Sequence, residues 1–176
     1  MSTWTYWPLQ KHPKAEKEAK RDDRSFFPIL LQGFAYACVW RIHSACWTAL
    51  FGLRSWPFLG ALAVLIAVIS VWLVIISVRT LGKQWAVAAR LVEGHKLITS
   101  GPYSFIRNPI YTGMFGMLVA TGMVASQWFG LLIGVVLFLA ATAWGIRVEE
   151  QLLHGRFGSE FEEYRGKVSA LIPLVW

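Results

Sequence analysis

Two adjacent carboxylates end a long apolar stretch, in the run Arg147-Val148-Glu149-Glu150. On a helix, neighbouring side chains point about 100° apart, whereas Arg147 and Glu150, three residues apart, share a face. Ionisable groups at a helix end beside an apolar segment usually face a cavity or an interface. The run is therefore a candidate binding or catalytic site, and the alternative is a solvated helix cap.

A second polar group lies in the connection over residues 79–109, where turn formers stand beside aromatic, basic and amide side chains. Gly101-Pro102 predicts a turn, and Pro109 predicts the start of the next helix. Asn108 is biased away from helical geometry by the proline after it. Loops of this length usually carry function or are disordered, and this composition favours a rigid polar collar at the mouth of a helix bundle.

The elements that hold these groups are apolar helices. Of the 176 residues, 56% are hydrophobic and 15% are charged, and the mean hydropathy is +0.48. Soluble domains carry about 25% charged residues, so this composition excludes an ordinary soluble protein. A bilayer-spanning helix needs about 20 apolar residues, and four segments predict such spans. The sequence predicts an all-α, polytopic membrane bundle in one domain over residues 1–176, with transmembrane helices at 26–53, 58–78, 110–125 and 128–146.

Positive charge indicates the orientation of these spans. Residues 1–24 hold six Lys and Arg, residues 79–109 hold five and residues 147–176 hold four, whereas the two short turns hold one and none. Cytoplasmic loops carry an excess of Lys and Arg. Both termini and the middle connection are therefore predicted to be cytoplasmic, which suits a prokaryotic inner membrane.

Several classes of function are not expected. The net charge of +7 follows from the same bias of cytoplasmic loops, so it does not indicate nucleic-acid binding. No Cys-x-x-Cys or His-rich spacing occurs, so no metal site is expected. His43 has no second histidine within the spans, which argues against haem. The first 25 residues are polar and predict no secretory signal peptide.

Two helices are predicted outside the spans. Residues 14–24 alternate in charge at a spacing that suits a short surface helix. Residues 153–164 place apolar side chains at helical spacing and predict an amphipathic helix, which lies on the bilayer or closes over the collar.

Small residues four apart lie on the last two spans, Gly116 with Ala120 and Gly130 with Gly134. Such pairs let membrane helices approach closely. They predict helix packing, and the alternative is that a glycine of the third span makes room for a ligand.

In their order along the chain, these motifs resemble the isoprenylcysteine carboxyl methyltransferase and phospholipid methyltransferase superfamily. The resemblance covers roughly residues 81–173. The family usually has Arg-His-Pro where this chain has Arg107-Asn108-Pro109. Asparagine can hydrogen-bond but does not titrate near neutral pH, so no acid–base role is expected there. The matching segments are His95 to Tyr103, Arg107-x-Pro109-x-Tyr111-x-Gly113, Arg147 to Glu150, Phe157-Gly158 and Tyr164.

The resemblance implies S-adenosylmethionine as methyl donor, bound on the cytoplasmic side, and a lipophilic acceptor that enters from the bilayer. Tyr103 or Tyr111 would stack on the adenine, Arg107 would pair with the carboxylate, and the glutamates would accept hydrogen bonds from the ribose and the ammonium. The implied cofactor-binding residues are His95, Leu97, Thr99, Gly101, Tyr103, Arg107, Asn108, Pro109, Tyr111, Gly113, Glu149 and Glu150.

Methyl transfer is a displacement at carbon that depends on alignment and needs no covalent enzyme intermediate. If the acceptor is a carboxylate, Arg147 would orient it, whereas an amine would lose its proton to Glu150. The resemblance favours carboxyl O-methylation of an isoprenylcysteine-like substrate. The alternatives are a phospholipid amine N-methyltransferase, an NADPH-dependent reductase resembling the sterol reductases, and a non-enzymatic lipid-binding membrane protein.

Overall fold

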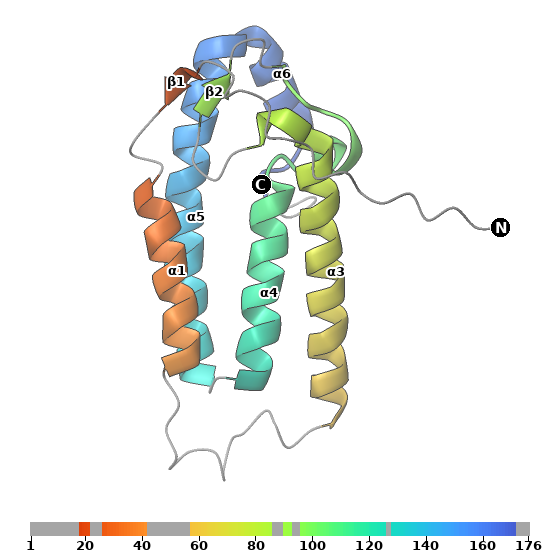
Figure 1. Cartoon of the computed structure of the whole chain (residues 1–176), viewed down its shortest axis with the longest axis vertical. Helices are drawn as coiled ribbons and strands as arrows, with labels where there is room; N and C mark the ends of the chain where they lie inside the picture. Colours follow the sequence, from red (N-terminus) through yellow and green to blue (C-terminus); the bar gives the residue numbers. More distant parts are fainter. Residues whose placement is uncertain are drawn as a thin grey trace, which may run out of the picture.

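A computed structural model describes residues 18–21, 26–41, 57–85, 90–92, 96–125 and 128–171 of the chain. Long helices dominate this part and run side by side, with α3 and α5 opposite in direction to α1 and α4 (Figure 1). Their bounds are α1 Phe26–Arg41, α3 Pro57–Leu81, α4 Pro109–Ala125 and α5 Trp128–Phe157. Shorter elements gather at one end: β1 Glu18–Arg21, η3 Gly82–Gln84, β2 Arg90–Val92, η4 Gly101–Ser104 and α6 Ser159–Lys167.

The helices α1, α3 and α4 begin within a residue of the predicted spans, and residues 42–53 of the first span lie outside the described residues. By contrast, α5 does not stop at Ile146 but continues to Phe157. Its 30 residues rise about 45 Å, which exceeds the roughly 30 Å apolar core of a bilayer. The charged end of α5, residues 147–157, therefore projects beyond the apolar part of the bundle.

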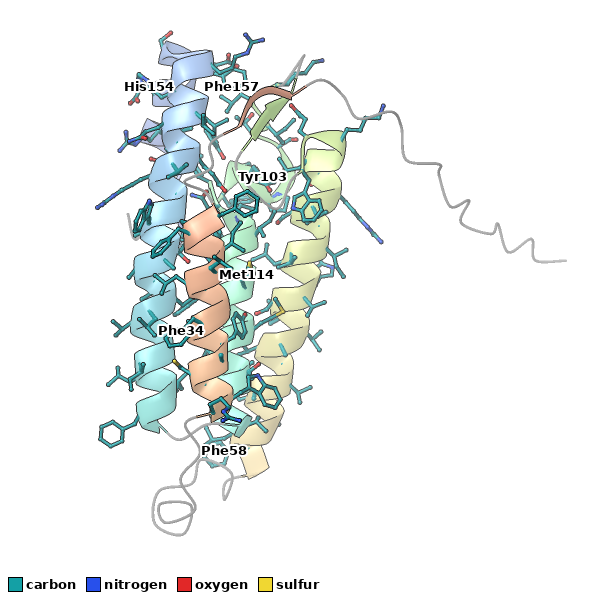
Figure 2. All side chains as sticks on the ribbon, turned by 60° about the vertical axis from the view of Figure 1, so that its left-hand side comes forward. Phe34, Phe58, Tyr103, Met114, His154 and Phe157 are labelled. Atoms are coloured by element: carbon teal, nitrogen blue, oxygen red, sulfur yellow. The ribbon has the colours of Figure 1, made fainter. Side chains whose placement is uncertain are left out.

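Two helices in the described part are long and apolar enough to cross a membrane, Phe58–Gln84 and Phe129–Phe157, and Pro109–Val124 is a shorter apolar helix. Their large apolar side chains point outward: Trp72 on α3 is 62% exposed and Val136 on α5 is 59% exposed. Figure 2 shows such side chains along the bundle, with Phe58 at one end and Phe34 further along. The apolar outer surface is typical of helices that face lipid.

The core lies where α1, α4 and α5 meet, around the fully buried Phe138, Leu118 and Val39. Glycines set the distance between helices. A side chain at Gly116 would collide with Ser70 of α3, and one at Gly134 would lie 3.2 Å from the carbonyl oxygen of Ala35 on α1. The helix-packing interpretation of these glycines is confirmed.

The all-helical fold is also confirmed, with one local correction. The predicted surface helix over residues 14–24 is wrong for Glu18–Arg21, which forms β1 and pairs antiparallel with β2. The rest of that prediction lies outside the described residues. Most helical stability in proteins comes from the packing of an apolar face, and the alternating charges of this segment provide no such face. An extended segment can instead bond its backbone to Arg90–Val92, the part of the middle connection beside it.

Candidate active site

The polar residues gather at the projecting end of α5. Three segments meet there: the collar, defined as residues 96–113, the end of α5 with α6, and the C-terminal segment, residues 168–171. Figure 2 places Tyr103 where the apolar bundle meets this end, below His154 and Phe157. The site therefore lies at the boundary between the apolar and the charged parts of the molecule.

The collar follows the predicted turn. Gly101 has φ +61°, a left-handed conformation that glycine adopts at little cost, and it opens the short helix η4. The Ser104 hydroxyl donates to the Gly101 carbonyl at 2.7 Å and closes the turn. Pro109 is buried and begins α4. These features place Tyr103 and Arg107 on the inner side of the turn, where both are largely buried.

The C-terminal segment runs alongside the collar and is tied to it by hydrogen bonds. The backbone N–H of Arg107 donates to the Ser169 carbonyl at 2.8 Å. Asn108 donates to the Ala170 carbonyl twice, from its backbone N–H and from Nδ2, both at 3.1 Å. The Tyr164 hydroxyl of α6 donates to the Tyr103 carbonyl at 2.6 Å. The predicted amphipathic helix over residues 153–164 is wrong as a single helix, because residues 153–157 belong to α5 and the chain turns at Gly158, whose φ is +54°. Only α6, from Ser159, closes over the collar.

Glu150 belongs to a cluster that we call the clasp: Arg107, Glu150 and Arg165. Nη2 of Arg107 lies 3.1 Å from Oε1 of Glu150, and Nε of Arg165 lies 3.7 Å from Oε2. Nη1 of Arg107 also donates to the Arg165 carbonyl at 2.7 Å. The side chains of Arg107 and Glu150 are only 11% and 17% exposed. The clasp thus joins the collar to α5 and α6. Within the described part of the chain, Nε of Arg107 and Oε1 of Glu150 are both buried without a hydrogen-bond partner, so the contact between Arg107 and Glu150 is an ion pair.

Glu149 occupies a different environment, which we call the niche: Tyr103, Tyr111, Gly145 and Glu149. The Tyr111 hydroxyl donates to Oε1 of Glu149 at 2.7 Å. Glu149 lies beyond the apolar stretch of α5, and burial raises the pKa of its carboxyl to about 7, although the bond from Tyr111 acts in the opposite direction. Burial, reinforced by the charge of Glu149, also raises the pKa of Tyr103. The niche therefore holds a carboxyl that is costly to ionise without a neighbouring cation.

The structure brings together six of the predicted site residues and separates others. Arg147 is exposed on α5, Leu97 is half-buried and Thr99 is exposed. Gly113 faces α3, where a Cβ would lie 2.8 Å from the Ser70 carbonyl, so it serves helix packing. His95 lies outside the described residues. Tyr103, Arg107, Tyr111, Glu149 and Glu150 meet in the clasp and the niche, and Asn108 lies beside the clasp.

Sequence reasoning missed three contributors. Arg165 completes the clasp, and Thr112 donates to the Leu171 carbonyl at 2.6 Å. Gly145 lies one turn before Glu149 and leaves space for the Tyr111 hydroxyl, which would be 3.1 Å from a Cβ. The four-residue spacing of Gly145 and Glu149 was a usable signal because such residues share a helix face. Arg165 and Thr112 gave no signal without knowledge of the tertiary contacts.

Comparison with known proteins decides the family. A model described as phospholipid methyltransferase matches residues 58–160, more than half of the chain. The chain belongs to the phospholipid methyltransferase family. The matched range includes the collar and the whole of α5, so it covers both the clasp residues Arg107 and Glu150 and the niche.

Curated relatives of this phospholipid methyltransferase family member cover the same region. The chain is similar to the protein-S-isoprenylcysteine O-methyltransferase of Schizosaccharomyces pombe, with 33% identity over 51% of this chain and 38% of the relative. It is also similar to the cobalt-zinc-cadmium resistance protein CzcN of Cupriavidus metallidurans, with 33% identity over 56% of this chain and 45% of the relative. The chain therefore spans less than half of the length of each of these relatives.

A solved structure shares the fold. The eukaryotic intramembrane Ras methyltransferase ICMT superposes with a TM-score of 0.61 at 19% identity, over 85% of this chain and 52% of that chain. Together with the apolar helices, the match supports an integral membrane protein of helical fold. The family resemblance predicted from the sequence motifs is confirmed.

Proposed function

We propose that the chain is an integral membrane methyltransferase that uses S-adenosylmethionine, held at the collar and the end of α5. The observation that carries the proposal is the niche: a partly buried carboxyl, Glu149, with a pKa raised to about 7, beside the aromatic Tyr103 and within the matched family region. Perturbed carboxyls of this kind cluster at functional sites. The site lies at the mouth of an apolar bundle, which suits a soluble donor and a lipophilic acceptor.

The residues of the site fit the donor. When bound, S-adenosylmethionine supplies a methyl group activated by a sulfonium, and it also carries an ammonium and a carboxylate. Glu149 offers a carboxylate to a cationic group, and the unpartnered Nε of Arg107 offers a buried donor to an anionic one. Tyr103 is buried beside Glu149, so stacking on the adenine requires that donor binding exposes its ring. Glu150 holds Arg107 in place. Of the other predicted contacts, Leu97, Thr99, Gly101 and Pro109 lie in the collar, whereas Asn108 bonds to the Ala170 carbonyl, Gly113 packs against α3 and His95 lies outside the described residues.

For the acceptor we propose the carboxylate of an isoprenylcysteine-like substrate. A carboxylate needs no general base, and Glu150, the base predicted for an amine, is already paired with Arg107 and Arg165. Arg147 lies exposed directly after the apolar stretch of α5, at the level where an acceptor's charged group would meet the membrane surface. The similarity to the protein-S-isoprenylcysteine O-methyltransferase of Schizosaccharomyces pombe supports this choice.

A phospholipid amine is the second candidate, and one observation favours it. An amine acceptor must lose a proton, and Glu149 has a pKa of about 7, which suits a general base at neutral pH. For either acceptor we propose the same topology, with both termini and residues 79–109 in the cytoplasm of a prokaryotic inner membrane. This orientation rests on the distribution of Lys and Arg along the chain.

Calorimetric titration of the purified protein with S-adenosylhomocysteine and with NADPH tests the donor. A methyltransferase binds the first, a sterol-reductase-like protein binds the second, and a lipid-binding scaffold binds neither. Transfer of a tritiated methyl group, offered separately to N-acetyl-S-farnesylcysteine and to phosphatidylethanolamine, then tests the acceptor, because a methyl ester releases its label in base and a methylated amine does not. Binding of NADPH alone would overturn the proposal.

A further inference from the structure

Gly145 is buried in α5 at a point where two other helices approach. A Cβ at this position would lie 3.1 Å from the Tyr111 hydroxyl oxygen and 3.5 Å from Cβ of Pro28 in α1. Since Tyr111 is in the first turn of α4, the phenol fills a space bounded by three helices. The missing side chain of Gly145 is what leaves that space open.

The phenol reaches Glu149 through this space. Tyr111 donates to Oε1 of Glu149 at 2.7 Å, and within the described residues no cation pairs with that carboxyl. Its neighbour Glu150 has two arginines at 3.1 and 3.7 Å. The titratable groups that act on Glu149 are Tyr111 of α4, Tyr103 of η4 and Glu150 of α5, whereas α1 presents the apolar Pro28. A hydroxyl that donates to a carboxylate favours the ionised form.

We infer that Tyr111 and Gly145 are positioning residues: Gly145 admits the phenol of Tyr111, and the phenol holds the Glu149 carboxylate in the orientation that receives a cationic group of the methyl donor. The inference rests on the proposed function for the identity of that cation. It assigns Tyr111 a role different from adenine stacking, because its hydroxyl is already bound to Glu149. It also gives a reason for glycine at position 145, because a Cβ there would force the phenol to shift.

Two substitutions test the inference in the full chain in lipid nanodiscs. Tyr111→Phe removes the hydroxyl and keeps the ring, and Gly145→Ala pushes the ring away from Glu149. Infrared difference spectra against Glu149→Gln follow the protonation of the Glu149 carboxyl without any cofactor. The titration midpoint should rise by about one pH unit in Tyr111→Phe, and in the same direction in Gly145→Ala, since a hydrogen bond to a charged group contributes about that much.

The affinity for S-adenosylhomocysteine should fall about fivefold at pH 7, because about one half of the carboxyl is ionised in the wild type and about one tenth in the variants. Most of this loss should disappear at about pH 8.5, where the carboxyl is mostly ionised in every variant, and the loss that remains measures the missing orientation. Gly155→Ala is the matched control, because Gly155 also lies in α5 but a Cβ there meets nothing within 4 Å. It should match the wild type in both readouts.

The inference is overturned if Tyr111→Phe and Gly145→Ala keep the wild-type midpoint and the wild-type affinity. Tyr111→Phe decides alone if Gly145→Ala does not fold. If the wild type binds no S-adenosylhomocysteine at any pH, the proposed function fails, and the infrared titration still decides whether Tyr111 positions Glu149.

Discussion

Glu149 and Glu150 are neighbours in sequence, yet they belong to two regions with opposite electrostatics. In the clasp, Glu150 is neutralised by Arg107 and Arg165, which come from the collar and α6. In the niche, Glu149 receives a neutral phenol and has no cation among the described residues. Because adjacent helical side chains point about 100° apart, one turn of α5 presents one carboxyl to each region.

This difference indicates a structural role for Glu150 and a binding role for Glu149. A carboxylate that is paired inside the protein has little left to offer a ligand, whereas one that is buried without a cation gains from a cationic ligand. The clasp therefore holds three segments together, and we propose that the niche is the region that stabilises a positively charged donor.

Breaking the clasp should cost the most stability. Arg107→Ala leaves Glu150 nearly buried, with only Arg165 at 3.7 Å, and removes the bond to the Arg165 carbonyl. We expect the free energy of unfolding to fall by about 3 kcal/mol, measured by tryptophan fluorescence on heating in nanodiscs. The double variant Arg107→Ala with Glu150→Gln should recover part of the loss because no charge is then left unpaired.

The matched control is Lys167→Ala, which breaks the exposed ion pair with Glu163 on α6. It should leave the unfolding transition unchanged, since exposed pairs contribute little. Equal losses in Lys167→Ala and Arg107→Ala would contradict the special role of the clasp.

The niche should make stability depend on pH. The pKa of Glu149 is raised to about 7 in the folded protein. The stability that its protonated form contributes is therefore fully present below the ordinary glutamate pKa. That contribution is lost as the pH rises through about 7, because ionisation is then costly in the fold and free in the unfolded chain. Without cofactor, the wild type should lose stability relative to Glu149→Gln between about pH 5 and pH 8. A stability difference that stays constant, or that changes in the other direction, would show that Glu149 is solvated.

A small effect is expected at Asn108, beside the clasp. Asn108→Ala removes the bond from Nδ2 to the Ala170 carbonyl, but the backbone N–H of the same residue still donates to that carbonyl. We expect a loss of about 1 kcal/mol in unfolding free energy and affinity for S-adenosylhomocysteine within about twofold of the wild type. A much larger drop in affinity would place Asn108 in direct contact with the cofactor.

The local amino-acid sequence predicted a large part of the structure. Hydropathy located the helices and Gly101-Pro102 located the turn of the collar, and the run ending in Glu149-Glu150 lies in the candidate site. These features depend on neighbours in sequence, which a single chain displays. The predicted span ends at Ile146 because hydropathy marks the end of the apolar stretch, whereas backbone hydrogen bonds continue α5 to Phe157.

What could not be predicted depends on contacts between distant segments. Gly113 belongs to the same motif as Tyr111 but lies on the opposite side of α4, against Ser70. The pairing of Glu150 with Arg165 requires α6 to fold back over the collar, and β1 requires a partner strand about seventy residues later. The spacing of residues along one element does not encode which neighbouring element each face will meet.

The division between niche and clasp is tested most directly by titrating Glu149→Gln and Glu150→Gln with S-adenosylhomocysteine at about pH 8 in one calorimetric series, with the melting temperature recorded for each. The account predicts that Glu149→Gln loses about tenfold or more in affinity with no fall in melting temperature. It predicts that Glu150→Gln lowers the melting temperature and loses less affinity. Wild-type affinity in Glu149→Gln, or the same losses in both variants, would contradict it.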